Sequence, residues 1–207
     1  MTLKNKLGIH NSMELARQEE RLTKIRAMEL FDKRLLESFE VGTYEGLRSI
    51  HEYLFQDVYC FAGEMRTADI AKGNFRFASA LYLAPALESI SAMPQSTFDE
   101  IVEKYVEMNV AHPFWEGNGR STRIWLDAIL RQELGQVVDW SHVDKEDYLL
   151  AMERSPVRDT EIKRLLQEAL TDAASDREVF MKGIDASYRY EGFGYYQTGS
   201  IPEEDEE

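Results

Sequence analysis

Apolar residues recur at every third or fourth position along most of the chain, which is typical of amphipathic helices packed around a core. The first such segment runs to about Leu36 from Asn11 or Ser12, either of which can cap it. The next opens at Thr43. Later segments with helical periodicity cover residues 82–93, 96–111, 121–134, 145–154, 159–171 and 176–190. The pattern therefore predicts an all-α fold, a helical bundle.

The periodicity changes between Met65 and Phe77. Residues that favour strands or turns alternate there, namely Thr67, Ile70, Lys72, Gly73, Asn74, Phe75 and Phe77. A segment with glycine and asparagine at its centre and aromatic residues beside them is better suited to a β-hairpin than to a helix. We therefore predict one small hairpin within the helical fold.

The segment 121–134 is apolar on nearly every side and is followed by Gly135, a residue that commonly ends helices. This predicts a buried central helix, with Trp125 in the core and Trp115 at packing or rim positions. The preceding helix shows a capping-box spacing, with Thr97 or Ser96 followed three residues later by an acid, and it leads directly into His112.

Composition narrows the protein class. A length of 207 residues with 43% hydrophobic residues, no internal repeat and no long linker predicts one domain. The net charge of −14 argues against non-specific binding to nucleic acid or to an anionic membrane, and part of it is an acidic, disordered tail at 199–207. Without a secretory signal or a membrane-length apolar run, a cytoplasmic location is expected. The single cysteine, Cys60, is predicted to pack in the core.

The stretch from His112 to Arg120 holds the candidate chemistry. The imidazole of His112 has an ordinary pKa of about 6.5, so it can accept a proton near neutral pH. Glu116 offers a hard oxygen ligand that suits Mg²⁺. Taken alone, a histidine before proline is usually a loop or core residue, but packing gives no reason to combine it with the residues that follow.

Those following residues are suited to bind an anion. Gly117 and Gly119 allow close approach of the backbone, and the loop feeds into the N-terminus of the central helix, where unpaired N–H groups favour phosphate. Arg120 and Arg123 add two guanidinium groups. The residues together predict a site for a magnesium-bound polyphosphate beside a general base.

This stretch resembles the signature of the Fic family, His-Pro-Phe-x-(Asp/Glu)-Gly-Asn-Gly-Arg-x-x-Arg, with every specified position matched. The resemblance implies the Fic fold, a helical bundle with a small hairpin flap. It also implies an enzyme, a protein adenylyltransferase that moves AMP from ATP to a Tyr, Thr or Ser hydroxyl of a target protein and releases pyrophosphate. Family members with lysine in place of the second glycine transfer phosphate, so Gly119 favours AMP transfer.

The resemblance assigns a role to each residue of the signature. His112 is the base that removes the hydroxyl proton, and Glu116 holds the Mg²⁺ that bridges the α- and β-phosphates. The phosphates are expected on Gly117, Asn118 and Gly119, with Arg120 near the β-phosphate and Arg123 toward the γ-phosphate.

The hairpin corresponds to the flap that binds the target's backbone as an added strand in this family. The candidate docking residues are Gly73, Asn74, Phe75, Arg76 and Phe77. The alternative is an ordinary hairpin with Phe75 or Phe77 in the core. Strand addition tolerates many sequences, so the target protein is not identified.

A second segment, Ser187 to Gly192, matches the family's inhibitory pattern (Ser/Thr)-x-x-x-Glu-(Gly/Asn). The resemblance pairs Glu191 with Arg123, which would place a carboxylate where the γ-phosphate should lie. It divides the chain into a catalytic domain at 1–174 and an inhibitory helix at 175–198. Without the resemblance, the segment is the frayed end of an amphipathic helix.

Family members with a C-terminal inhibitory helix self-associate, so the resemblance implies a homo-oligomer. They also modify a tyrosine of that helix, which makes Tyr188 a candidate acceptor of AMP and Tyr190 a weaker one. Either tyrosine can equally be a packing residue. Two other functions stay open: removal of AMP from a modified protein, with Glu191 orienting a water, and nucleotide-dependent regulation without turnover. The presence of His112 argues against the second, because binding needs no base.

Overall fold

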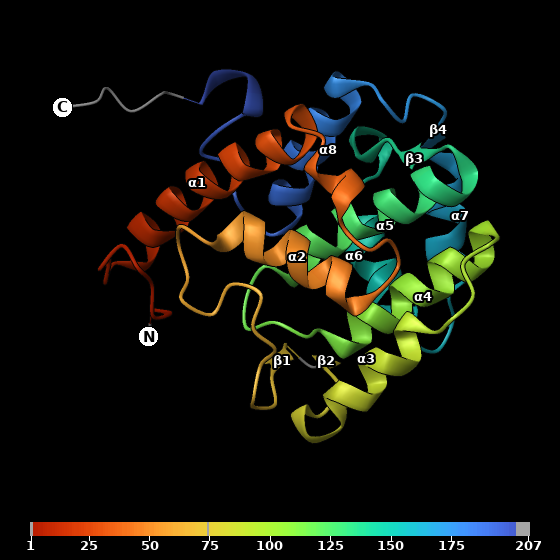
Figure 1. Cartoon of the computed structure of the whole chain (residues 1–207), viewed down its shortest axis with the longest axis horizontal. Helices are drawn as coiled ribbons and strands as arrows, with labels where there is room; N and C mark the ends of the chain where they lie inside the picture. The colour runs from red at the N-terminus through yellow and green to blue at the C-terminus, as the bar shows by residue number, and fades with distance from the viewer. Residues whose placement is uncertain (1, 74, 202–207) are drawn as a thin grey trace.

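The computed structural model describes residues 2–73 and 75–201, and helices dominate this part of the chain (Figure 1). The α-helices are α1 (Ser12–Asp32), α2 (Tyr44–Phe55), α3 (Leu83–Ser91), α4 (Phe98–Ala111), α5 (Asn118–Leu134), α6 (Lys145–Arg154), α7 (Thr160–Glu168) and α8 (Arg177–Tyr190). Short 3₁₀ turns are η1 (Leu35–Ser38), η2 (Ala80–Tyr82), η3 (Trp140–His142) and η4 (Thr198–Ser200). The predicted all-α class is confirmed.

Side-chain caps set several helix starts where the sequence placed them. Asn11 accepts hydrogen bonds from two backbone N–H groups of α1, and Thr43 accepts one from Gly46 in α2. Thr97 and Glu100 form the complete capping box at the start of α4. Polar residues just before each apolar stripe therefore fix the entry of the chain into these helices.

Helix α5 lies at the centre of the molecule and packs against α2, α4 and α8 (Figure 1). Its residues Ile124, Leu126 and Ile129 are buried, and Trp125 is 1% exposed, as predicted. Helix α1 lies across α2 and α8 on one side. The N-terminus of α5 is thus held in a rigid core, as a binding loop requires.

The predicted hairpin is present as β1 (Ala71–Lys72) paired antiparallel with β2 (Phe75–Arg76), and it projects at the edge of the fold beside α3 (Figure 1). A second pair, β3 (Val137–Val138) with β4 (Leu170–Thr171), was not expected from the sequence. It shortens the helix predicted over 159–171, which ends at Glu168. The paired strands β3 and β4 lie more than thirty residues apart in the sequence, so no local sequence pattern predicts their pairing.

Two other expectations are corrected. Helix α1 ends at Asp32 and not at Leu36, because Arg34 adopts a left-handed conformation (φ 56°) before η1. Cys60 is exposed and does not pack in the core, because the turn after α2 buries Val58 and Tyr59 and directs the next side chain outward. In the described part of the chain, no helix is both long enough and apolar enough to cross a membrane.

Candidate active site

His112 ends α4 in a left-handed conformation, with φ 49° and ψ 64°. This is uncommon for a residue with a side chain and needs support from its surroundings. The buried guanidinium of Arg66 provides it, donating hydrogen bonds to the carbonyl oxygens of His112 (2.7 Å), Ala111 (3.0 Å) and Ala78 (2.5 Å). A loop arginine that the sequence did not single out therefore connects the candidate base to the segment that follows the hairpin.

The imidazole of His112 stacks on Phe77, with ring centroids 3.6 Å apart, so the hairpin covers one face of the candidate base. Its Nδ1 lies 3.3 Å from the carbonyl oxygen of Asn109, which can only accept, so Nδ1 carries the proton and Nε2 has the lone pair. Burial lowers the pKa of His112 to about 4, against the opposing effects of this hydrogen bond and of Glu191. At neutral pH the ring is uncharged and can accept a proton.

The loop after His112 has its shape fixed from inside. The Asn118 side chain accepts a hydrogen bond from the Phe114 N–H and donates one to the Phe114 carbonyl, each at 2.8 Å. Gly117 has φ 76°, and a Cβ there would lie 2.2 Å from the Phe55 ring. The side chain of Asn118 thus stabilises the loop, so only its backbone is free to bind an anion.

His51 on α2 supports the same loop. Its Nδ1 accepts the Gly63 N–H at 2.9 Å, so Nε2 donates to the Glu116 carbonyl at 2.8 Å. The ring also stacks on Phe114 at 3.7 Å, and burial lowers the pKa of His51 to about 3. On an apolar helix face such a histidine gives no distinctive sequence signal.

Arg120 lies in the interior and not in the cavity. It is 1% exposed and donates to Glu19 of α1 at 2.5 Å and to Glu116 at 3.0 Å. Aromatic rings surround its guanidinium, including those of Phe55 and Tyr188. The predicted contact of Arg120 with a β-phosphate is therefore not prepared in this conformation, where Arg120 instead orients the carboxylate of Glu116.

A cavity of about 700 Å³ opens at the N-terminus of α5. This volume suits a nucleotide-sized ligand. Its lining brings together most of the predicted site residues, namely Gly73, Phe75, Phe77, His112, Glu116, Gly117, Asn118, Gly119, Arg123 and Glu191. Arg76 and Ser187 lie outside the lining, and Asn74 lies outside the described residues. The polar lining residues Lys72, Tyr148 and Glu153 are among those that the sequence did not assign to the site.

Glu116 is the candidate metal ligand of this cavity. Among the residues that the structure describes, no three or more His, Cys, Asp or Glu side chains gather as a metal site. A single carboxylate fits Mg²⁺, which commonly binds one or two carboxylates and takes its other ligands from substrate phosphates and water. The Glu116 side chain is 40% exposed, so it is accessible from the cavity.

The guanidinium of Arg123 bonds mainly to residues at the C-terminal end of α8. Its Nε donates to Ser187 Oγ at 2.7 Å, and its Nη2 donates to the Ser187 carbonyl and to Glu191 Oε1, each at 3.0 Å. Tyr148 Oη lies 3.3 Å from Nη1. The contact of Glu191 with Arg123 that the resemblance implied is thus present, and Ser187 of the same motif contacts Arg123 as well.

The carboxylate of Glu191 projects into the cavity in its ionised form. Burial alone would raise its pKa, but the charges of Arg123, Lys72 and Arg120 outweigh burial and lower the pKa to about 2. A Cβ on Gly119 would lie 2.2 Å from Glu191 Oε1, so the absence of a side chain there makes room for this carboxylate.

Two tyrosines anchor the C-terminal end of α8. Tyr188 is buried and donates to Thr23 Oγ1 of α1 at 2.6 Å, while Tyr190 donates to the carbonyls of Trp140 (3.0 Å) and Val143 (2.7 Å). Both hydroxyls are therefore packing and hydrogen-bonding groups in this conformation.

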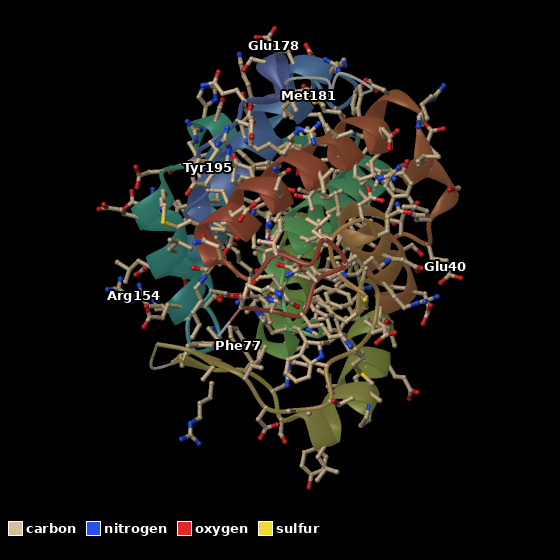
Figure 2. All side chains as sticks on the ribbon, turned by 90° about the vertical axis from the view of Figure 1, so that its left-hand side faces the viewer. Glu40, Phe77, Arg154, Glu178, Met181 and Tyr195 are labelled. Atoms are coloured by element: carbon tan, nitrogen blue, oxygen red, sulfur yellow. The ribbon has the colours of Figure 1, made fainter. Side chains whose placement is uncertain are left out.

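The segment after α8 returns across α1, where Figure 2 shows Tyr195 beside this helix. The buried carboxylate of Glu20 accepts the N–H groups of Tyr195 (2.9 Å) and Tyr196 (3.2 Å). The buried Lys24 ammonium donates to the Tyr196 carbonyl (2.5 Å) and to Asp185 (2.9 Å). These contacts hold the segment that follows α8 against α1.

Comparison with known proteins adds to this geometry. Residues 42–130 match the model of the Fic/DOC family, a range that includes the hairpin and the signature but not α8. Over 189 residues, the chain is 31% identical to a protein of Bartonella schoenbuchensis named protein adenylyltransferase VbhT. That match covers 84% of this chain and 38% of the relative, so the chain spans well under half of that protein.

Other relatives match over most of their length. A probable protein adenylyltransferase Fic of Salmonella typhimurium is 28% identical over 187 residues, which cover 83% of this chain and 88% of the relative. The crystal structure of BepC, a VirB-translocated effector of Bartonella tribocorum with bound AMPPNP, superposes with a TM-score of 0.66 at 18% identity, over 83% of this chain and 93% of that one. The structural likeness confirms the predicted fold.

Proposed function

The chain belongs to the Fic/DOC family, and from this membership we propose that it is a protein adenylyltransferase, which transfers AMP from ATP to a hydroxyl side chain of a target protein. One observation carries the proposal most strongly. An uncharged His112 with a proton-accepting Nε2 lines a nucleotide-sized cavity together with Arg123. A protein that only bound nucleotide would need the cations but not the base.

His112 acts as the general base. The target hydroxyl gives its proton to His112 Nε2 while its oxygen bonds to the α-phosphorus, and the bond from that phosphorus to the bridging oxygen of the β-phosphate breaks, releasing pyrophosphate. The stacked ring of Phe77 and the hydrogen bond to Asn109 hold the imidazole in one orientation during this step. Its low pKa keeps it available as a base over the whole neutral range.

The phosphates are expected at the N-terminus of α5. There the backbone N–H groups of residues 118–120 begin the helix and face the loop, and the helix dipole favours negative charge. Glu116, held by Arg120, would bind Mg²⁺, which neutralises charge on the phosphates when bound. Arg123 would meet the γ-phosphate after α8 has released it.

The hairpin β1–β2 is proposed to dock the target as an added strand. Phe77 lies at the foot of the hairpin (Figure 2). Its ring stacks on the imidazole of His112, so a strand paired with the hairpin would pass beside His112. Because the two strands are short, they offer few side-chain contacts to a bound target. This agrees with recognition of the target's backbone and not of its amino-acid sequence. Phe75 and Phe77 form an edge-to-face pair and are only partly buried, so both stay near the cavity.

Residues 1–174 are proposed as the catalytic domain and 175–198 as a segment that inhibits it. Glu191 occupies Arg123 with a carboxylate, so a nucleotide in the cavity would lack its γ-phosphate contact and face a like charge. The contacts of Ser187 with Arg123 support the same role. Of the predicted tail at 199–207, residues 199 and 200 belong to the 3₁₀ turn η4 (Thr198–Ser200), and residues 202–207 lie outside the described residues.

Modification of the chain's own Tyr188 stays a prediction with a structural condition attached. Its hydroxyl is buried against α1, so it becomes an acceptor only after α8 leaves the domain. An AMP group on this tyrosine would then prevent α8 from returning. Self-association and a cytoplasmic location also stay predictions.

Transfer of label from α-labelled ATP tests the proposal. With Mg²⁺ and a cell lysate, the Glu191→Gly variant is expected to label protein strongly, the unmodified chain weakly, and Glu191→Gly combined with His112→Ala not at all. Labelling that persists without His112 would remove it as the base. If Glu191→Gly instead loses an ability of the unmodified chain to release AMP from labelled protein, removal of AMP is the principal reaction.

A further inference from the structure

The carboxylate of Glu191 is shared between two cations from different parts of the fold. Its Oε1 lies 3.0 Å from Arg123 Nη2 on α5, and its Oε2 lies 3.2 Å from Lys72 Nζ on β1. An anion that gives one oxygen to each cation marks a binding position between them. Only one of these cations, Arg123, belongs to the signature.

We propose that Lys72 is a second phosphate-binding residue, which pairs with Glu191 in the inhibited state and with the terminal phosphate of ATP once Glu191 has left. This inference rests on the proposed function, because it takes ATP as the ligand of the cavity. It extends the phosphate site from the α5 loop to the hairpin.

The charges around the cavity support this role. Among the described residues that line it, Lys72 and Arg123 are the only lysine or arginine side chains. Arg120 lies behind the wall in its pair with Glu19. When Glu191 departs, Lys72 and Arg123 lose the carboxylate that they share, and a polyphosphate would supply oxygens to both.

The two cations differ in freedom. Arg123 is buried and held by Tyr148, so it is a fixed point. The Lys72 side chain is 70% exposed on β1. The partner strand β2 leads into Phe77, whose ring stacks on His112. A long ammonium side chain on an anchored strand can follow a phosphate that lies slightly apart from the position of the carboxylate.

The hairpin also contains a matched control. Lys72 pairs across the strands with Phe75, and both line the cavity, whereas Arg76 pairs with Ala71 and its exposed side chain does not line the cavity. Loss of either cation changes the net charge equally. A specific phosphate contact is lost only with Lys72.

Binding of ATP and of AMP, measured by titration calorimetry with Mg²⁺ in the Glu191→Gly background, tests the inference. Lys72→Met is expected to weaken ATP binding about fivefold and to leave AMP binding unchanged, because AMP lacks the terminal phosphates. Lys72→Arg is expected to retain most of the ATP affinity, and Arg76→Met all of it.

Three results would overturn the inference: no change in ATP binding with Lys72→Met, an equal change with Arg76→Met, or an equal loss of AMP and ATP binding. The readout does not depend on transfer. A variant that binds ATP through Lys72 but transfers no AMP would refute the proposed function alone. Failure of Glu191→Gly to bind ATP would refute both.

Discussion

Replacing Glu191 with glutamine removes the charge from the α8 contact while keeping its size. The pKa of Glu191 is about 2 against an ordinary 4.5, because Arg123, Lys72 and Arg120 outweigh the effect of burial. Since one pKa unit corresponds to about 1.4 kcal/mol, the folded site favours the ionised over the neutral carboxyl by about 3 kcal/mol. Glutamine resembles the neutral acid, so docking of this carboxyl position should weaken by up to about 3 kcal/mol, on the order of 100-fold.

The assay is the initial rate of label transfer from α-labelled ATP at saturating ATP. Glu191→Gln is expected to exceed the unmodified chain by up to about 100-fold. Glu178→Gln is a suitable control, because it removes an exposed carboxylate from the same helix without touching the cavity. The increase should disappear when His112→Ala is added.

Two results would rule out inhibition by the Glu191 carboxylate. If Glu191→Gln binds ATP but transfers no faster than the unmodified chain, Glu191 does not inhibit. If Glu178→Gln activates equally, the effect is a general loosening of α8 and not the loss of the carboxylate at Arg123. The lowered pKa also means that the charged contact is complete above about pH 4.5 and is lost only as pH falls through about 2, so mild acid should not activate the chain.

Three further outcomes are expected. In Glu191→Gln, kcat/KM for AMP transfer should stay level down to about pH 5 and fall toward pH 4, because burial lowers the pKa of His112 to about 4. A pH profile with its midpoint near 6.5, the ordinary pKa of histidine, would contradict this. Tyr190→Phe removes the hydroxyl that bonds to the carbonyls of Trp140 and Val143, so the free energy of unfolding in urea should fall by about 1–2 kcal/mol. The rate of AMP transfer should rise, because α8 is held less firmly. If neither the free energy of unfolding nor the transfer rate changes, Tyr190 does not anchor α8. Lys24→Met leaves the carboxylates of Glu20 and Asp185 without their ammonium partner, so the free energy of unfolding should fall by about 3–5 kcal/mol. Proteolysis of the segment after α8 should also become faster. A fall below about 1 kcal/mol would contradict a structural role for the two ion pairs of Lys24.

The signature loop could be predicted because its requirements are local. Gly117 has a positive φ, a conformation that glycine adopts readily, so this requirement is reflected in the residue type itself. Helix caps such as Thr97 with Glu100 are equally local. The contact of Glu191 with Arg123 was also expected, but from a resemblance and not from the pattern of residues alone.

The parts that were missed depend on partners far away in the chain. Arg120 pairs with Glu19, and Arg66 binds the carbonyl of His112, across separations that no periodicity reveals. The contact of Lys72 with Glu191 links two segments 119 residues apart. Cys60 had apolar neighbours in sequence, yet the turn that carries it faces solvent.

Mass spectrometry of the Glu191→Gly variant after incubation with ATP and Mg²⁺ would identify the group that the enzyme transfers. We expect an AMP adduct on a hydroxyl side chain of the chain itself or of an added target, absent when His112→Ala is combined with Glu191→Gly. A phosphate adduct, or no adduct from a variant that binds ATP, would contradict an adenylyltransferase held inactive by Glu191.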